Sequence, residues 1–285
     1  MPAKLELQNV SYYYGKGTAF EVKALDNVSF CINTGSITGL IGHTGSGKST
    51  LAQLFNGLEK PTEGKVLLDG CDIWDKKYKG NRICFRVGLV MQYPEYQLFE
   101  ETVYDDIAFG PRNMGLEDEE IKKRVSDAVA FVGLSPEVMQ QSPFDLSGGQ
   151  KRRVAIAGIM AMQPELLVLD EPAAGLDPSG RAEIFGGIKK YRDTTGATVL
   201  IISHSMEDMA EYCDDIIVMN RGAVMLSGAK DDIFSDSDCL IEAGLDIPQI
   251  TRVMRILKQN GIEIDDSCCT KDRAVAELLR ALKKK

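Results

Sequence analysis

The sequence predicts an α/β protein whose parallel sheet is assembled from two separated stretches of chain. A glycine-rich loop at residues 42–50 lies between an apolar strand and a helix with apolar periodicity. Two unbroken apolar runs, 166–170 and 198–203, are typical of parallel strands covered on both faces. Between these parts, residues from about 93 to 162 are mainly helical in pattern. We therefore expect a split core with a helical insertion.

The other elements follow in chain order from their hydropathy patterns. Strands are expected at residues 5–11, 24–32, 36–41, 65–69, 87–91, 166–170, 198–203, 216–219 and 223–226. Helices are expected at residues 49–56, 119–132, 148–162 and 179–191, and again from about residue 231. Asn220 and Gly222 indicate a hairpin between the last two strands. The core should then span residues 1–92 and 163–229, with a small tail domain after it.

Composition narrows the class of protein. The chain has 285 residues, 44% hydrophobic and 26% charged, as in soluble globular proteins. No apolar run approaches the roughly 18 residues that span a bilayer, and residues 1–7 lack the apolar core of a signal peptide, so we expect a cytosolic location. A net charge of −9 argues against nucleic acid as main partner. Seven cysteines without a Cys-x-x-Cys pair make a metal site improbable.

The glycine-rich loop predicts a phosphate-binding site. Gly42, Gly47, Lys48 and Ser49 fill the pattern Gly-x₄-Gly-Lys-Ser between a strand and a helix. Glycines let backbone N–H groups surround a polyphosphate, Lys48 reaches the β- and γ-phosphates, and the Ser49 hydroxyl ligates Mg²⁺. The predicted nucleotide-binding residues are Gly42, His43, Thr44, Gly45, Ser46, Gly47, Lys48, Ser49 and Thr50.

Polar residues at three other strand ends supply the remaining chemistry. Asp170 and Glu171 end a buried strand, where Asp170 is placed to hold Mg²⁺ through a water and Glu171 to deprotonate the attacking water. His204 follows the next strand in sequence, and its imidazole could hydrogen-bond a γ-phosphate oxygen; alone it would more often be a packed structural histidine. Gln92 closes the strand at 87–91, and its amide can contact both Mg²⁺ and the attacking water.

A second glycine stretch, Leu146–Gln150, opens the helix at 148–162. The Ser147 hydroxyl and the N–H groups of Gly148 and Gly149 form a phosphate clamp. The cations at 151–153 oppose the helix dipole, which we interpret as a sign of an anion bound in front. Since the loop at 42–50 already holds its own nucleotide, we expect the clamp to serve a nucleotide on another subunit.

This set of motifs, with Asp177 added, resembles the nucleotide-binding domain of ABC transporters over about residues 4–229. The resemblance implies a P-loop ATPase core with an antiparallel β subdomain and the inserted helical subdomain. It also implies a head-to-tail dimer that sandwiches two ATP molecules. An aromatic side chain should stack on adenine; Tyr14 is the nearest match, and Tyr12 or Tyr13 are alternatives. The residues expected to contact the partner's ATP are Ser147, Gly148, Gly149, Gln150 and Asp177.

A narrower resemblance is to the ATPases of energy-coupling factor transporters. It rests on residues 42–48, on 93–111 and on the helical tail at 230–285, which is expected to be a dimerisation element. Such systems import vitamins or transition-metal ions. Two related ATPases pair beneath a transmembrane coupling protein, with a separate substrate-binding membrane protein, at the cytoplasmic face of the membrane. The forms of residues 42–44 and 92–95 resemble the second ATPase of the pair; a homodimer remains an alternative.

In this interpretation an acidic stretch after Gln92 docks the arginine-bearing coupling protein. Its members are Glu95, Glu100, Glu101, Asp105 and Asp106. The alternative for each is a solvated surface acid. The rival functions are an ATPase of a conventional amino-acid or metal importer, and a soluble ABC protein that acts on ribosomes or DNA. The second rival would need a second cassette or a long coiled coil, and the sequence has neither.

Overall fold

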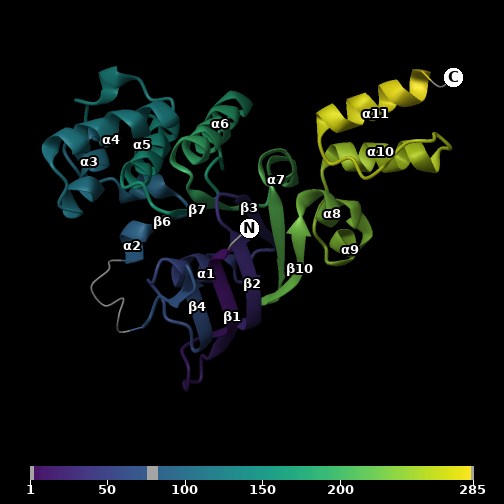
Figure 1. The fold of residues 1–285 in the computed structure, drawn as a ribbon, viewed down its shortest axis with the longest axis horizontal. Coiled ribbons are helices and arrows are strands. Elements are labelled where there is room, and N and C mark those ends of the chain that lie inside the picture. Colours follow the sequence, from purple (N-terminus) through teal and green to yellow (C-terminus); the bar gives the residue numbers. More distant parts are fainter. Residues whose placement is uncertain (1–2, 76–82, 284–285) are drawn as a thin grey trace.

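The computed structural model describes residues 3–75 and 83–283, which form two sheets and two groups of helices (Figure 1). The larger sheet has six strands in the order β10-β9-β3-β8-β7-β6, all parallel except β10. Its strands are β3 (Ile37–Gly42), β6 (Val87–Val90), β7 (Leu166–Asp170), β8 (Thr198–Ile202), β9 (Asp215–Asn220) and β10 (Ala223–Ala229). Strands β3 and β6, from before the helical insertion, share this sheet with four strands from after it, so the core is split as the apolar runs predicted.

A second, antiparallel sheet covers one face of the first. Its strands, in the order β2-β1-β4-β5, are β1 (Ala3–Tyr14), β2 (Val22–Asn33), β4 (Glu63–Leu68) and β5 (Cys71–Asp72). Helix α1 (Lys48–Phe55) shares one apolar core with both sheets, in which Leu54 and Phe55 are fully buried. The glycine-rich loop that precedes α1 is therefore fixed by a buried strand on one side and a buried helix on the other.

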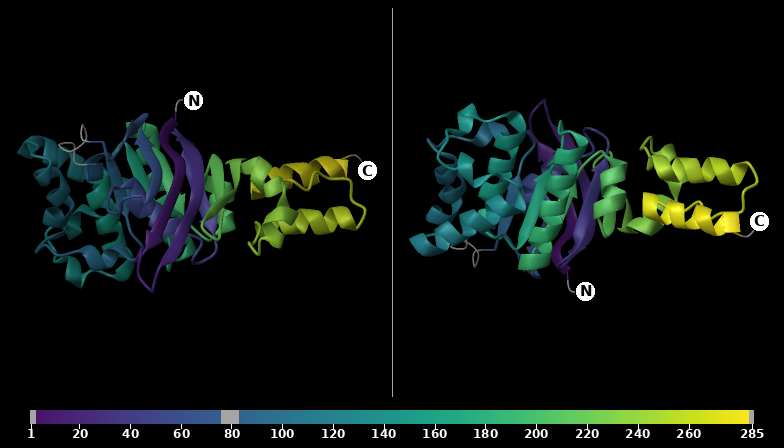
Figure 2. Two further views of the ribbon diagram at one scale, coloured as in Figure 1. Left: turned by 90° about the horizontal axis from the view of Figure 1, so that it is seen from below. Right: turned by 90° about the horizontal axis from the view of Figure 1, so that it is seen from above.

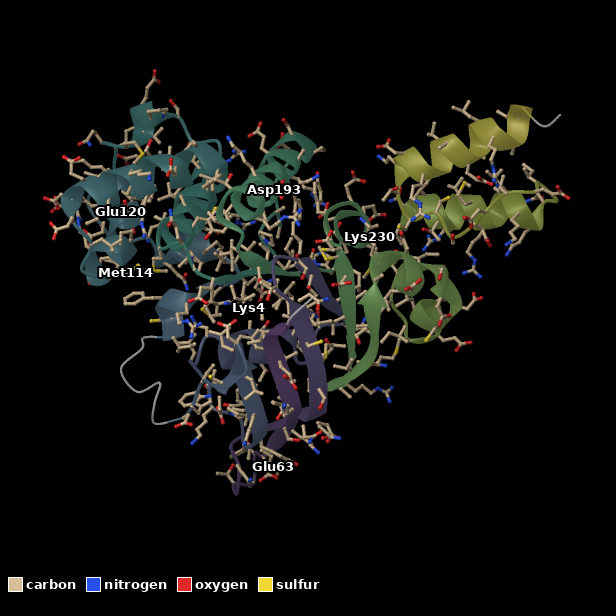
Figure 3. All side chains as sticks on the ribbon, in the orientation of Figure 1. Lys4, Glu63, Met114, Glu120, Asp193 and Lys230 are labelled. Carbon is tan, nitrogen blue, oxygen red and sulfur yellow. The ribbon has the colours of Figure 1, made fainter. Side chains whose placement is uncertain are left out.

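Four charged side chains join the two sheets. Lys4 Nζ contacts carboxylate oxygens of Asp69 and Glu165, at 2.9 and 2.5 Å, and the Arg86 guanidinium contacts the same two carboxylates at 2.7 Å. The Arg86 hydrogen bonds, followed by those of Lys4, lower the pKa of Glu165 to about 2. Figure 3 shows Lys4 where the sheets meet, far from Glu63 at the tip of the antiparallel sheet.

Helices cover the other face of the six-stranded sheet. Crossover helix α6 (Pro178–Thr195) and the short α7 (Met206–Tyr212) pack there. The insertion contributes α3 (Val103–Asn113), α4 (Asp118–Phe131) and α5 (Gly148–Ala161), preceded by α2 (Ile83–Arg86) and joined by the 3₁₀ turns η2 (Pro94–Gln97), η3 (Pro136–Val138) and η4 (Pro143–Asp145).

The tail forms a separate group of helices at the end of the molecule opposite to the insertion (Figure 2). Its helices are α8 (Lys230–Ser235), α9 (Ser237–Glu242), α10 (Gln249–Gln259) and α11 (Lys271–Lys283). Met254, Cys268 and Ala274 form a small core between α10 and α11. Both helices also leave apolar side chains exposed, including Ile256 and Leu279. Within the described part of the chain, every helix is too short or too polar to cross a membrane.

Candidate functional site

A cavity of about 780 Å³ lies at the carboxyl edge of the six-stranded sheet. All but one of the residues predicted for nucleotide binding and catalysis within one chain line it. They are Tyr14, Gly42, His43, Thr44, Gly45, Gly47, Lys48, Ser49, Thr50, Gln92, Asp170, Glu171 and His204. The exception is Ser46, which is buried in the same loop, where its N–H bonds the His43 carbonyl oxygen. The sheet therefore brings together groups that are far apart in sequence.

The loop before α1 depends on glycine for its shape. Gly47 has a φ of 100°, and a Cβ there would lie 2.6 Å from Leu25 Cδ2 and 2.9 Å from the Ala24 carbonyl oxygen. Lys48 Nζ donates to the carbonyl oxygens of Gly42 and His43, at 2.6 and 2.9 Å. Burial lowers the pKa of Lys48, while Asp170 and Glu171 oppose this shift. The ammonium group is held among the loop carbonyls, ready for a phosphate.

Two of the three predicted Mg²⁺ ligands, Ser49 and Asp170, are already neighbours, and the third, Gln92, lines the same cavity. Ser49 Oγ donates to Asp170 Oδ2 at 3.0 Å. Burial raises the pKa of Asp170, while the Ser49 hydrogen bond counteracts the shift. Among the described residues no group of three or more His, Cys, Asp or Glu side chains could hold a metal ion. A hydroxyl and one carboxylate fit Mg²⁺, which keeps several waters and takes substrate phosphate oxygens as ligands.

Glu171 and His204 are in direct contact. His204 Nδ1 lies 2.7 Å from Glu171 Oε1, which also accepts the His204 backbone N–H at 3.0 Å. Ser203 Oγ donates to Glu171 Oε2 at 3.2 Å. Glu171 has a φ of 52°, a region that costs a non-glycine residue energy and that occurs often at functional sites. The segment after β8 therefore fixes both oxygens of this carboxylate.

The structure separates the three tyrosines of β1. Tyr14 lines the cavity and is 41% exposed, with its hydroxyl 3.1 Å from Thr50 Oγ1. Tyr12 is buried and donates to Glu59 at 2.6 Å; burial and this carboxylate raise the pKa of Tyr12 to about 12. Tyr13 instead lies near the ammonium groups of Lys16 and Lys23. Of the three, only Tyr14 lines the cavity.

The residues predicted to act on a partner's nucleotide do not line this cavity. Ser147 caps α5 in a capping box: its hydroxyl accepts from Gln150 N at 3.3 Å, and its own N–H donates to Gln150 Oε1 at 3.0 Å. Asp177 caps α6 by accepting from Gly180 N at 3.1 Å. A Cβ on Gly148 would meet nothing within 4 Å. In the part of the chain that the structure describes, no contact requires a glycine there.

The interpretation of the cations in the first turn of α5 was wrong for two of the three. Arg152 is buried and pairs with Glu95 at 3.0 Å, and it also donates to the Ala174 carbonyl oxygen. Arg153 pairs with Glu183 at 2.8 Å. Both guanidinium groups therefore have partners in their own chain, and their position at the helix start is no sign of a bound anion.

The acidic stretch is also engaged within the chain. Besides the pair between Glu95 and Arg152, Asp105 pairs with Arg112 at 2.8 Å. Asp106 accepts the backbone N–H groups of Phe99 and Glu100. Glu100 is half-buried, and Glu101 is exposed. Glu95 and Asp105 therefore each have an arginine of their own chain beside them, and their contact with arginines of a partner stays a prediction.

An apolar hollow of about 300 Å³ lies next to the acidic stretch. It lies among η2, α3 and α5, and Leu98, Phe99 and Phe109 are among its lining residues. The rings of Phe99 and Phe109 meet edge to face with centroids 4.8 Å apart, and both remain partly exposed, at 56% and 42%. No local sequence pattern indicates this hollow, because its walls come from separate elements.

The tail also reaches the nucleotide cavity, which no sequence signal indicated. Gly244, Leu245 and Asp246 line it, about 200 residues after the glycine-rich loop. His43 Nε2 lies 3.0 Å from the Ala243 carbonyl oxygen, and such an oxygen can only accept. The Gln249 backbone N–H donates to Glu207 on α7 at 3.1 Å. The tail thus contacts both the glycine-rich loop and α7.

Comparison with known proteins gives matches over the whole chain. A family model described as ABC transporter matches residues 25–174, and one described as AAA domain, putative AbiEii toxin, Type IV TA system matches residues 140–209. The energy-coupling factor transporter ATP-binding protein EcfA2 of Caldanaerobacter subterraneus subsp. tengcongensis is 51% identical, covering 99% of this chain and 98% of that protein. The protein of the same name from Clostridium acetobutylicum is 52% identical with the same coverage.

Solved structures are also similar. The structure of cbiO1 from Clostridium perfringens is described as part of the ABC transporter complex cbiONQ. It superposes on this chain with a TM-score of 0.75 at 37% sequence identity, and the match covers 90% of this chain and 100% of that one. The dimeric structure of a post-hydrolysis state of the ATP-binding cassette MJ0796, bound to ADP and Pi, superposes with a TM-score of 0.70 at 29% sequence identity. This match covers 79% of this chain and 98% of that one. These structures confirm the predicted fold class.

Proposed function

Since this chain belongs to the ABC transporter ATPases, in the family of energy-coupling factor transporter ATP-binding proteins, we propose that it is the second of two related ATPases that power an importer of vitamins or transition-metal ions. The observation that carries the proposal is one cavity that unites a phosphate loop, a Ser49–Asp170 pair and a Glu171–His204 pair. The names of the relatives favour this role over a conventional importer or a soluble ABC protein.

In the proposed reaction the loop and Lys48 bind the phosphates of ATP, and Tyr14 stacks on the adenine. A water oxygen attacks the γ-phosphorus, and the bond to the bridging oxygen breaks, so that the electron pair stays with ADP. Glu171 takes the water proton, because it lines the cavity and its oxygens are held by Ser203 and His204. The His204 imidazole and the Gln92 amide orient the γ-phosphate and the water.

Mg²⁺ fits the pair of Ser49 and Asp170, with Gln92 in the same cavity as a further oxygen ligand. When bound, the ion neutralises charge on the β- and γ-phosphates. The buried Asp170 carboxylate then gains a cation beside it, which offsets the desolvation that raises its pKa.

The remaining half of each site is proposed to come from a second ATPase. The cavity of their own chain is not lined by Ser147, Gly148, Gly149 or Gln150, and Gly148 has open space where a partner's phosphates would lie. Asp177 would contact the partner in the same dimer.

The exposed apolar faces of α10 and α11 are proposed as a dimerisation element, and residues 1–229 as the ATP-binding domain.

The transmembrane coupling protein is proposed to dock at the hollow near residues 95–106, with the substrate-binding membrane protein reached indirectly and the ATPase at the cytoplasmic face of the membrane. Because Glu95 and Asp105 already pair within the chain, we base docking on apolar contact with Phe99 and Phe109. Charged neighbours such as Glu101 would then form the rim.

The test of the chemistry is Glu171→Gln in the assembled transporter. We expect ATP binding to persist and turnover to fall by about 100-fold or more, because the amide keeps the shape but cannot take the proton. Turnover at the wild-type rate would remove Glu171 from this role.

The test of docking is Phe109→Asp, with Phe20→Asp as the matched control. Phe20 is 86% exposed on the turn between β1 and β2 and lies outside the hollow. We expect Phe109→Asp to lose co-purification with the membrane partners and uptake into vesicles while it still binds ATP, and Phe20→Asp to retain both. A fully active Phe109→Asp complex would contradict the docking site.

A further inference from the structure

The segment that carries His204 is tied to the start of α6 by one arginine. Arg181 Nη1 donates to Asp208 Oδ2 at 3.1 Å and to Ser205 Oγ at 3.3 Å. Asp208 is on α7 and is 7% exposed; burial raises its pKa, and Arg181 opposes the shift. The Ser205 hydroxyl caps the same helix by accepting from Asp208 N at 3.3 Å. One guanidinium therefore holds both the cap and the first turn of α7.

These contacts continue to the catalytic carboxylate. The Ser205 N–H donates to Ser203 Oγ at 3.2 Å, and Ser203 Oγ donates to Glu171 Oε2 at 3.2 Å. The donors and acceptors are compatible, because the Ser203 hydroxyl accepts with its oxygen and donates its hydrogen. A shift of the segment from Ser203 to Ser205 would move both donors that fix Glu171.

At its other end the network reaches the residue expected to contact the partner subunit. The backbone N–H of Arg181 donates to the Asp177 carbonyl oxygen at 2.9 Å, in the same turn that the Asp177 side chain caps. Asp177 and Arg181 are thus one helical turn apart. The first turn of α6 lies between a partner-facing residue and the segment that carries His204.

We propose that Arg181 is a positioning residue for ATP hydrolysis. It transmits the position of Asp177 at the dimer contact to Ser205, and through Ser203 to Glu171 and His204. The proposal rests on the proposed roles of Asp177, Glu171 and His204. It predicts that turnover, rather than nucleotide affinity, depends on Arg181, because the network does not include the phosphate loop.

The main experiment compares Arg181→Met with Arg192→Met in the assembled ATPase. Arg192 lies near the other end of α6, where it pairs with Asp193 and Asp214 beside the start of β3, at the opposite edge of the sheet. We expect kcat to fall about tenfold or more in Arg181→Met with KM for ATP nearly unchanged, as for a misplaced catalytic group. Arg192→Met should keep kcat, and Arg181→Lys should restore part of it.

Hydrogen exchange gives a second readout. Backbone amides of residues 203–208 should exchange faster in Arg181→Met than in Arg192→Met. Equal exchange in the two variants, or wild-type kcat in Arg181→Met, would overturn the proposal.

A double variant separates positioning from packing. The Asp208 carboxylate is buried and the Arg181 side chain is partly exposed, so apolar side chains at both positions leave no buried charge without its partner. Arg181→Met with Asp208→Leu should therefore recover the unfolding temperature, even if the single variant folds poorly, but should not recover kcat. Recovery of kcat together with stability would show that the pair is only structural. Glu171→Gln in parallel distinguishes the causes, because an active Glu171→Gln enzyme would contradict the proposed site itself.

Discussion

The N-termini of α1 and α5 are alike in sequence chemistry and different in their surroundings. Each helix begins beside glycines, a hydroxyl residue and a lysine. Around α1 the chain gathers Asp170, Glu171 and His204 into one cavity. Around α5 the Ser147 hydroxyl caps its own helix, and the position of Gly148 opens onto empty space. From this difference we propose that the phosphate site at α1 is built within the chain and that the site at α5 is completed by a second chain.

The largest expected effect is a difference in ATP affinity between variants of Lys48, at the start of α1, and of Lys151, at the start of α5. Lys48→Ala should weaken ATP binding by the isolated chain about 10- to 100-fold, because one charge-assisted contact to phosphate is lost. Lys151→Ala, in the first turn of α5, should leave this affinity unchanged. A titration with ATP measures both. Equal losses would remove the distinction between the two helix ends.

The next prediction tests the sharing of sites between subunits. Lys48→Ala in one ATPase of the dimer and Gly149→Asp, or its counterpart, in the other should place both lesions in one composite site and leave the second site active. The same two changes in a single subunit should damage both sites. ATPase rates of the two arrangements give the comparison, and equal rates would contradict a head-to-tail dimer.

A milder change tests the empty space at α5. Gly148→Ala should reduce turnover of the dimer about tenfold, if phosphates approach this backbone closely. It should leave the unfolding temperature unchanged or slightly higher, because alanine suits a helix better than glycine. Gly47→Ala is the contrast: its φ of 100° and its close neighbours predict lower stability. Calorimetry and ATPase assays measure the two effects separately.

The smallest expected effect is on the unfolding free energy and concerns Ser147, which caps α5. Ser147→Ala should cost about 1 kcal/mol of unfolding free energy, equivalent to about 2 °C in a chain of this size. Ser147→Thr should retain most of the cap. An unchanged unfolding temperature for Ser147→Ala would show that the capping box adds nothing to stability, and that this serine is free for a ligand.

Predictions from the sequence succeeded where the signal is local. The run from Gly42 to Thr50 sets a loop and a helix by itself, and the apolar strand β7 ends at Asp170 as predicted. Predictions about charges were less successful. Arg152 was expected to mark a bound anion and Glu95 to dock a partner. Although they are 57 residues apart in sequence, they pair with each other in a buried contact. The partner of a charged side chain depends on tertiary contacts, which no local pattern encodes.

By itself the sequence determined the phosphate loop, the acidic strand end, the second glycine stretch at Leu146–Gln150 and the split α/β core, because these depend on residue type and short-range periodicity. Only the tertiary structure decided which groups meet. It selected Tyr14 for the cavity, joined His204 to Glu171 and tied Arg181 to Asp208. It also brought the tail to His43 across 200 residues. Parallel strands place their carboxyl ends at one edge of a sheet, and strand order, which the sequence does not show, determines what gathers there.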